Sequence, residues 1–181
     1  SLPHFLDQHS ALHRDRDIEF EPVARTRATP PAGLRRVDHV AQTMRFEDMQ
    51  SWLLYYLTTF EMTKSAIVNV ADPSGIVRSQ AIESPEGEVR LNLNGAANVD
   101  TLAGSFVSGR LGAGVQHIAF QTDDIFETSA QLKASGFARL SVPQNYYSDT
   151  QTAFGLDDAM TDELRRHNIL YDEDEHGGYF Q

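Results

Sequence analysis

The sequence of 181 residues contains no cysteine. Disulfide bonds, zinc–thiolate sites, iron–sulfur clusters and a cysteine nucleophile are therefore excluded for these residues. A metal ion bound here would need histidine, carboxylate or other oxygen ligands. Such ligands suit divalent ions, and we expect iron(II), manganese or magnesium as the cofactor.

Long apolar runs and excess positive charge are also missing. No apolar run approaches the roughly 20 residues that span a bilayer, and the first residues lack the pattern of a signal peptide. Lys and Arg number 15 against 26 Asp and Glu, giving a formal net charge of −11, which repels a phosphate backbone. We predict a cytoplasmic homo-oligomer that binds a small molecule, with no nucleic-acid or membrane partner.

The chain divides into a short N-terminal part and a main body. Residues 1–23 are too few to bury a core, and we interpret them as the tail of a preceding module. Residues 24–34 include two consecutive prolines and are predicted to be a linker. Residues 35–181 form the main domain. The last residues, GYFQ, resemble a strand that lacks its continuation, so we expect a fragment of a longer protein.

The main body alternates between strand and helix patterns, judged by apolar periodicity. The first unit, about residues 35–95, is predicted as strand 36–44, helix 46–60 and strands 65–70, 77–82 and 89–94. A helix over 98–107 precedes the second unit, about residues 112–181. That unit is predicted as strand 115–122, helix 123–135, strand 138–142, helices 146–154 and 158–167, and hairpin strands 169–172 and 178–181. This order predicts an α+β fold of paired βαβββ modules, the second incomplete, with a curved mixed sheet around a metal.

Two histidines occupy matched positions in these units. His39 lies in VDHVAQ and His117 in VQHIAF, each within the first strand of its unit. An imidazole on a strand built for burial needs a polar partner. Two such strands can bring their imidazoles together, and two histidines with one carboxylate form a facial triad that leaves coordination positions open. The alternative is that each is a hydrogen-bonded core histidine.

These motifs resemble a known family. VDHVAQ, LNLN, GAGVQHIAF with TDDIF, NYY and ILYDEDEHGGYFQ follow one another as in the C-terminal module of 4-hydroxyphenylpyruvate dioxygenase-like proteins of the vicinal-oxygen-chelate superfamily. The resemblance implies that His39 and His117 are two of three metal ligands. The third, a glutamate, is expected beyond residue 181. It also implies that four polar residues bind substrate, namely Ser79, Asn94, Gln116 and Gln181.

One position departs from the dioxygenase pattern. The family has a glutamine in the helix before the glycine-rich turn, where this chain has Leu102. A pocket without that amide would hold 4-hydroxyphenylpyruvate poorly.

A second resemblance is more extensive. VDHVAQ, WLLYY, DPSGIVRSQA, NYYSD, FGLDDA and ILYDEDEHGGYF are similar to the C-terminal domain of bacterial two-domain 3-dehydroshikimate dehydratases. There the conversion of 3-dehydroshikimate to protocatechuate takes place in a separate barrel, which implies a metal-binding accessory domain here. Three hypotheses follow. The first is the C-terminal, dioxygenase-like domain of a 3-dehydroshikimate dehydratase, with a cyclic hydroxy-acid as the substrate. The second is a stand-alone iron(II)-dependent 4-hydroxyphenylpyruvate dioxygenase, with a keto-acid as the substrate, and the third is a non-catalytic module for small-molecule binding or oligomerisation.

Overall fold

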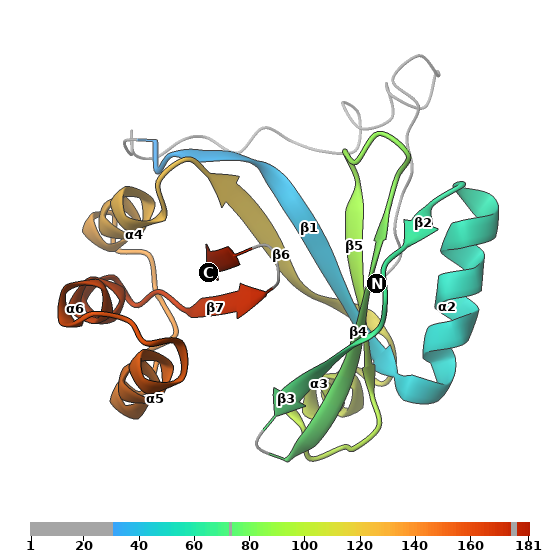
Figure 1. The fold of residues 1–181 in the computed structure, drawn as a ribbon. Coiled ribbons are helices and arrows are strands. Elements are labelled where there is room, and N and C mark those ends of the chain that lie inside the picture. The colour runs from blue at the N-terminus through green and yellow to red at the C-terminus, as the bar shows by residue number, and fades with distance from the viewer. Residues whose placement is uncertain (1–30, 73, 175–176) are drawn as a thin grey trace. The chain divides into compact units, whose positions relative to one another are not determined.

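The computed structural model describes residues 31–72, 74–174 and 177–181. The N-terminal tail and most of the linker expected from the sequence lie outside these residues. The described chain forms two compact units, residues 37–120 and residues 31–36 with 121–181 (Figure 1). The strands β1 (Leu34–Arg45) and β6 (Gly114–Thr122) contribute residues to both units.

The first unit is built on a mixed six-stranded sheet. Its main path runs in the order β2 (Thr63–Lys64), β4 (Gly75–Glu83), β5 (Arg90–Ala96), β1 and β6. Strand β3 (Val68–Asp72) pairs with residues 75–79 of β4. The parallel pair is β1 with β5, whereas β4 is antiparallel to β2, β3 and β5.

Helix α2 (Phe46–Thr59) covers one face of this sheet. Its first turn contains Glu47 and Asp48, whose charges favour the positive end of the helix dipole. Gly95 of β5 permits close contact, because a Cβ there would lie 2.9 Å from the sulfur of Met49. The residues buried in this core come from α2, from the facing positions of the strands and, in the case of Met62, from the segment before β2: Met44, Met49, Leu53, Tyr56, Met62, Ile82 and Leu93.

Helix α3 (Leu102–Arg110) packs against the opposite face, near the ends of β4 and β5 (Figure 1). Ala103 of the helix contacts the paired residues Val77 and Ala96. The helix begins at Thr101, whose hydroxyl accepts a hydrogen bond from the backbone N–H of Gly104. A side chain at Gly104 would collide with the backbone of residues 98–99, so the tight entry to α3 requires glycine.

The second unit contains three helices and a hairpin. They are α4 (Ile125–Ala134), α5 (Gln144–Phe154), α6 (Asp158–His167), β7 (Tyr171–Asp174) and β8 (Gly177–Phe180). Asp124 and Asp157 cap α4 and α6 by accepting backbone N–H groups. The core of this unit is centred on Tyr147, Leu164 and Ile169. In the described part of the chain, no helix has the length and apolar character needed to cross a membrane.

The predicted elements agree with this structure in most places, and two differ. The expected strand 65–70 is only partly correct, because residues 65–67 form no regular strand and β3 begins at Val68 and continues to Asp72. The expected strand 138–142 is wrong, because the structure has no regular strand there. The side chain of Asn168 instead accepts the N–H of Val142 and donates to the carbonyl of Leu140, so it takes the backbone groups that a neighbouring strand would need.

Candidate functional site

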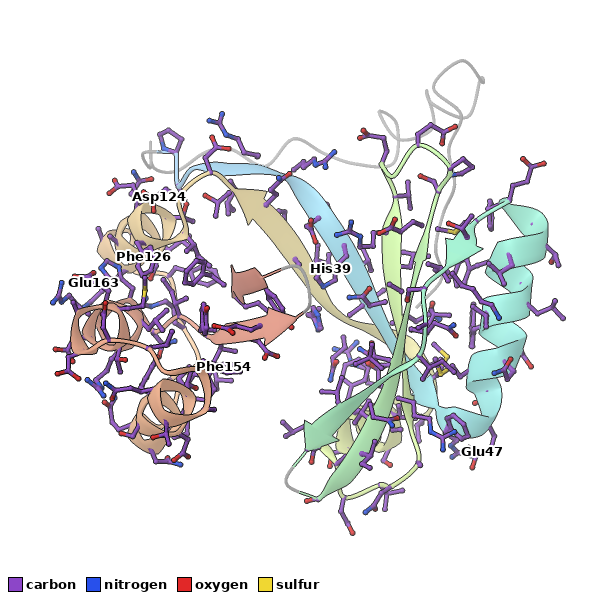
Figure 2. All side chains as sticks on the ribbon, in the orientation of Figure 1. His39, Glu47, Asp124, Phe126, Phe154 and Glu163 are labelled. Carbon is purple, nitrogen blue, oxygen red and sulfur yellow. The ribbon has the colours of Figure 1, made fainter. Side chains whose placement is uncertain are left out.

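The two matched histidines meet in the first unit. His39 lies on β1 and His117 on β6, which are neighbouring strands of the sheet, and Figure 2 labels His39 on β1. Their ring centroids are 5.6 Å apart, with an edge-to-face angle of 78°. His39 is half-buried, and His117 is more exposed, although its ring is partly screened from solvent. The sheet therefore brings together the two side chains that the sequence singled out.

His39 is oriented by charged neighbours. Its Nδ1 lies 2.8 Å from Oδ2 of Asp38, and because a carboxylate only accepts, Nδ1 carries the proton. The lone pair of Nε2 is then available to a ligand. A guanidinium nitrogen of Arg90 lies 3.5 Å from the same carboxylate oxygen, and Nε of Arg90 donates to Glu83 over 2.5 Å. This chain of charges holds one tautomer of His39, as in metal sites where a carboxylate supports a histidine ligand.

His117 is biased toward its neutral form. Desolvation lowers the pKa of His117 below the usual value of 6.5, and the proximity of His39 lowers it further. A neutral imidazole is the form that binds metal ions. The sign of this shift therefore favours metal binding at neutral pH.

Polar residues line the same region of the sheet in a row across four strands. Ser79 of β4 pairs with Asn94 of β5, and Asn94 pairs with Thr43 of β1, so these side chains share the face opposite α2. The hydroxyl of Thr43 donates to Oε1 of Gln116 on β6 over 3.1 Å. Gln116 is thereby left with its amide N–H groups to offer. Three of the four predicted substrate residues thus lie in one row.

The histidine pair fits a metal in part. Imidazole nitrogens bind divalent ions at about 2.1 Å, which places the centroids of two rings on one ion roughly 5 Å apart. The observed separation of 5.6 Å between His39 and His117 is close to that value. No group of three or more His, Cys, Asp or Glu side chains arranged to hold a metal occurs among the described residues. The residues present therefore supply two nitrogen ligands of a larger set.

The two remaining positions of interest are on other elements of the chain. Gln181 follows β8 in the second unit, where its backbone exchanges hydrogen bonds with Leu170 and its side chain is exposed. Leu102 is the first residue of α3, is 75% exposed, and donates its backbone N–H to Asp72. A leucine offers no hydrogen bond to a ligand from this helix.

Sequence reasoning missed several contributors to this region: Asp38, Thr43, Glu83, Arg90 and Asn92. Two of them could have been found from strand periodicity. Thr43 lies four residues after His39, and Asn92 lies two residues before Asn94, so each shares a strand face with a residue already identified. The roles of Glu83 and Arg90 depend on pairing between strands, which one sequence does not specify.

Comparison with known proteins identifies the family. Residues 36–176 match the glyoxalase/bleomycin resistance protein/dioxygenase superfamily. The chain belongs to this superfamily. The match includes both histidines and the whole polar row.

Curated members of the superfamily that resemble the chain include two kinds of enzyme. A 3-dehydroshikimate dehydratase of Pseudomonas putida is 39% identical over 178 residues, which are 98% of this chain and 28% of that protein. A 4-hydroxyphenylpyruvate dioxygenase of Pseudomonas aeruginosa is 27% identical over 157 residues, covering 86% of this chain and 44% of that enzyme. The chain thus spans about 28% of the length of the dehydratase, which corresponds to one domain.

Solved structures of the superfamily agree with both resemblances. A mutant of 4-hydroxymandelate synthase from Streptomyces coelicolor matches with a TM-score of 0.71 and 26% identity, covering 88% of this chain and 45% of that chain. A protein described as a xylose isomerase-like TIM barrel/4-hydroxyphenylpyruvate dioxygenase fusion matches with a TM-score of 0.60 and 34% identity, covering 82% and 24%. The α+β fold with a βαβββ-like order is therefore that of the superfamily.

Proposed function

We propose that this chain is the metal-binding, dioxygenase-like domain of a protein resembling 3-dehydroshikimate dehydratase. The observation that carries the proposal is the meeting of His39 and His117 beside the row of Ser79, Asn94 and Gln116. The extent of the similarity to the dehydratase, over almost the whole chain, supports this choice of relative. In this proposal the dehydration itself takes place in another domain.

His39 and His117 would hold iron(II), manganese or magnesium, completed by a glutamate beyond residue 181. A bound divalent ion polarises the oxygen of a carbonyl or carboxylate group. The protein's own contribution is orientation: Asp38 fixes the tautomer of His39, and Gln116 presents amide N–H groups to an oxygen of the ligand. Gln181 is proposed as a further contact with the substrate, on the family resemblance alone.

A stand-alone 4-hydroxyphenylpyruvate dioxygenase is the second candidate, favoured by the relative of that name and by the fold. Leu102 argues against it, because the exposed leucine on α3 replaces an amide that the dioxygenase pattern places there. The third candidate, a non-catalytic binding or oligomerisation module, would need no metal at all.

Parallel assays on the product of the whole gene separate these candidates. The metal-loaded protein is given 3-dehydroshikimate while protocatechuate is followed by absorbance, and 4-hydroxyphenylpyruvate while oxygen uptake is followed with an electrode. We expect protocatechuate and no oxygen uptake, with metal content reduced by His39→Ala and by His117→Ala. A Leu102→Gln variant is a useful companion, because it restores the amide of the dioxygenase pattern.

Two other results would contradict the proposal. Oxygen uptake without protocatechuate would identify a dioxygenase and show that Leu102 is compatible with that activity. Neither activity, together with unchanged metal content in both histidine variants, would favour the non-catalytic module.

A further inference from the structure

Asn92 lies on the same face of the sheet as the candidate site and has an unused hydrogen-bonding group. On β5, Asn92 and Asn94 point to the face opposite α2, whereas Leu91, Leu93 and Gly95 face the α2 side. The side-chain oxygen of Asn92 is buried and has no hydrogen-bond partner among the described residues. Buried polar atoms are normally satisfied, so this oxygen requires an explanation.

The residues beside Asn92 account for its lack of a partner. Its cross-strand neighbours are Ala41 on β1 and Ala81 on β4, whose side chains carry no polar atom. Arg90, two residues earlier on β5, is held by Glu83 and Asp38. Small alanines on both sides leave Asn92 as the polar centre of a row that is otherwise apolar.

The position of this row relates Asn92 to the candidate site. On β1, Ala41 stands between His39 and Thr43, so the row of Ala81, Asn92 and Ala41 runs between the histidine and the row formed by Ser79, Asn94 and Thr43. A ligand that reaches from the histidine pair to that polar row would pass over Asn92.

We propose that Asn92 is a specificity-determining residue that accepts a hydrogen bond from a hydroxyl of a hydroxylated cyclic acid. The assignment rests on the proposed function, because it places the ligand on the face where the histidines meet. An acceptor oxygen pairs with a donor and repels carboxylate and keto oxygens. The carboxylate and ketone of the ligand are expected at groups that attract them, namely the metal and the amide N–H groups of Gln116 and Asn94.

This selection favours a substrate with hydroxyl groups on its ring. 3-Dehydroshikimate carries a carboxylate, a ketone and two adjacent hydroxyls on a six-membered ring. Its analogue 3-oxocyclohex-1-ene-1-carboxylate has the same ring, ketone and carboxylate but neither hydroxyl. A site that uses a buried acceptor to bind a hydroxyl discriminates strongly against the analogue that lacks it. The two compounds therefore probe Asn92 directly.

The experiment titrates both compounds into the 181-residue chain by isothermal titration calorimetry, with Mn²⁺ present. We expect the hydroxylated compound to bind at least roughly tenfold more tightly than its deoxy analogue. Asn92→Leu should reduce that preference to less than about threefold, because it lowers the affinity for the hydroxylated compound and leaves the affinity for the deoxy analogue unchanged. Asn145→Leu, the same change at an exposed position of α5 in the second unit, should keep the full preference.

A second variant covers the possibility that Asn92→Leu folds poorly. Asn92→Asp keeps an acceptor oxygen, so the preference for the hydroxylated compound should persist. The added negative charge should lower the affinity for both compounds, because each carries a carboxylate. Equal affinities for the two compounds in the unaltered chain, or a preference unchanged by Asn92→Leu, would overturn the role of Asn92 and leave the proposed function standing. No binding of either compound would overturn the assignment of the ligand, and with it the role of Asn92, whereas the proposed metal-binding function is tested separately by the metal content of His39→Ala and His117→Ala.

Discussion

Replacement of Asp38 by asparagine tests whether the charges beside His39 serve metal binding. Oδ2 of Asp38 accepts a hydrogen bond from Nδ1 of His39 over 2.8 Å, and a guanidinium nitrogen of Arg90 lies 3.5 Å from the same oxygen. Asparagine keeps nearly the same shape and an acceptor oxygen but removes the charge. The imidazole would lose the charged acceptor of its Nδ1–H, so its tautomer would be less strongly fixed.

The size of the effect follows from comparable sites. Loss of a group that orients a histidine ligand typically lowers metal affinity about 10- to 100-fold, which corresponds to about 1.4–2.7 kcal/mol. The assay is a Mn²⁺ titration of the product of the whole gene, followed by the electron paramagnetic resonance signal of the free ion. The Mn²⁺ site to be compared between variants is the binding site that is lost in the titration of His39→Ala. Asp100→Asn removes the same charge from an exposed loop and should leave that affinity within about twofold, as expected for an exposed charge.

Equal Mn²⁺ affinity in Asp38→Asn and in the unaltered protein would refute this reasoning. It would mean that the contact between Asp38 and His39 is a surface ion pair of little consequence, and that the histidine is oriented by other contacts. A fall in affinity that also occurs in Asp100→Asn would point to general charge instead of local orientation.

Three further predictions follow from the same structure. His39→Ala and His117→Ala should each remove the shared Mn²⁺ site while circular dichroism stays unchanged, and full occupancy in either variant would contradict the pairing. Because the pKa of His117 is lowered in the folded state, the unfolded chain takes up more protons below pH 6.5, so this residue reduces stability as pH falls through that window. The metal-free His117→Asn variant should therefore lose less thermal stability than the unaltered protein between about pH 7 and pH 5, and identical slopes would disprove this. Gly95→Ala should lower the free energy of unfolding by about 1–3 kcal/mol, because the new methyl group would meet Met49 at 2.9 Å and Phe46 at 3.1 Å; a urea titration with an unchanged midpoint would contradict that contact.

The sequence predicted the first unit well because local periodicity matches its tertiary contacts. Met49, Leu53 and Tyr56 are spaced for one helix face, and all three are buried in α2. The alternation in β5 separates Leu93 on the core side from Asn94 on the opposite face, as the alternating pattern required. Recognition of the superfamily from its motifs is confirmed by the family match.

Features that depend on which distant segments contact each other could not be predicted from the sequence. Ala138 to Val142 has strand-like composition, but Asn168, 26 residues after Val142, occupies its backbone groups. The contact of Arg90 with Asp38 likewise needs the parallel register of β1 and β5, which no local pattern encodes. The metal ligands and substrate residues stay predictions, since family resemblance suggests their roles and geometry alone shows only which of them lie together.

The two faces of the sheet differ in a way that folding alone does not require. The face under α2 is filled by Met44, Leu93 and their neighbours, which is how a sheet normally gains stability from burial. On the opposite face, the buried apolar cluster formed by the described residues is limited to Val77, Ala96 and Ala103 of α3. Thr43 is fully buried beyond that region, and the oxygen of Asn92 lacks a partner among the described residues. Each unsatisfied buried oxygen costs about 1–3 kcal/mol, so an apolar residue at this position would stabilise the fold more. Surplus hydrogen-bonding capacity on rigid strands, beside two histidines, is best explained by a ligand that satisfies it.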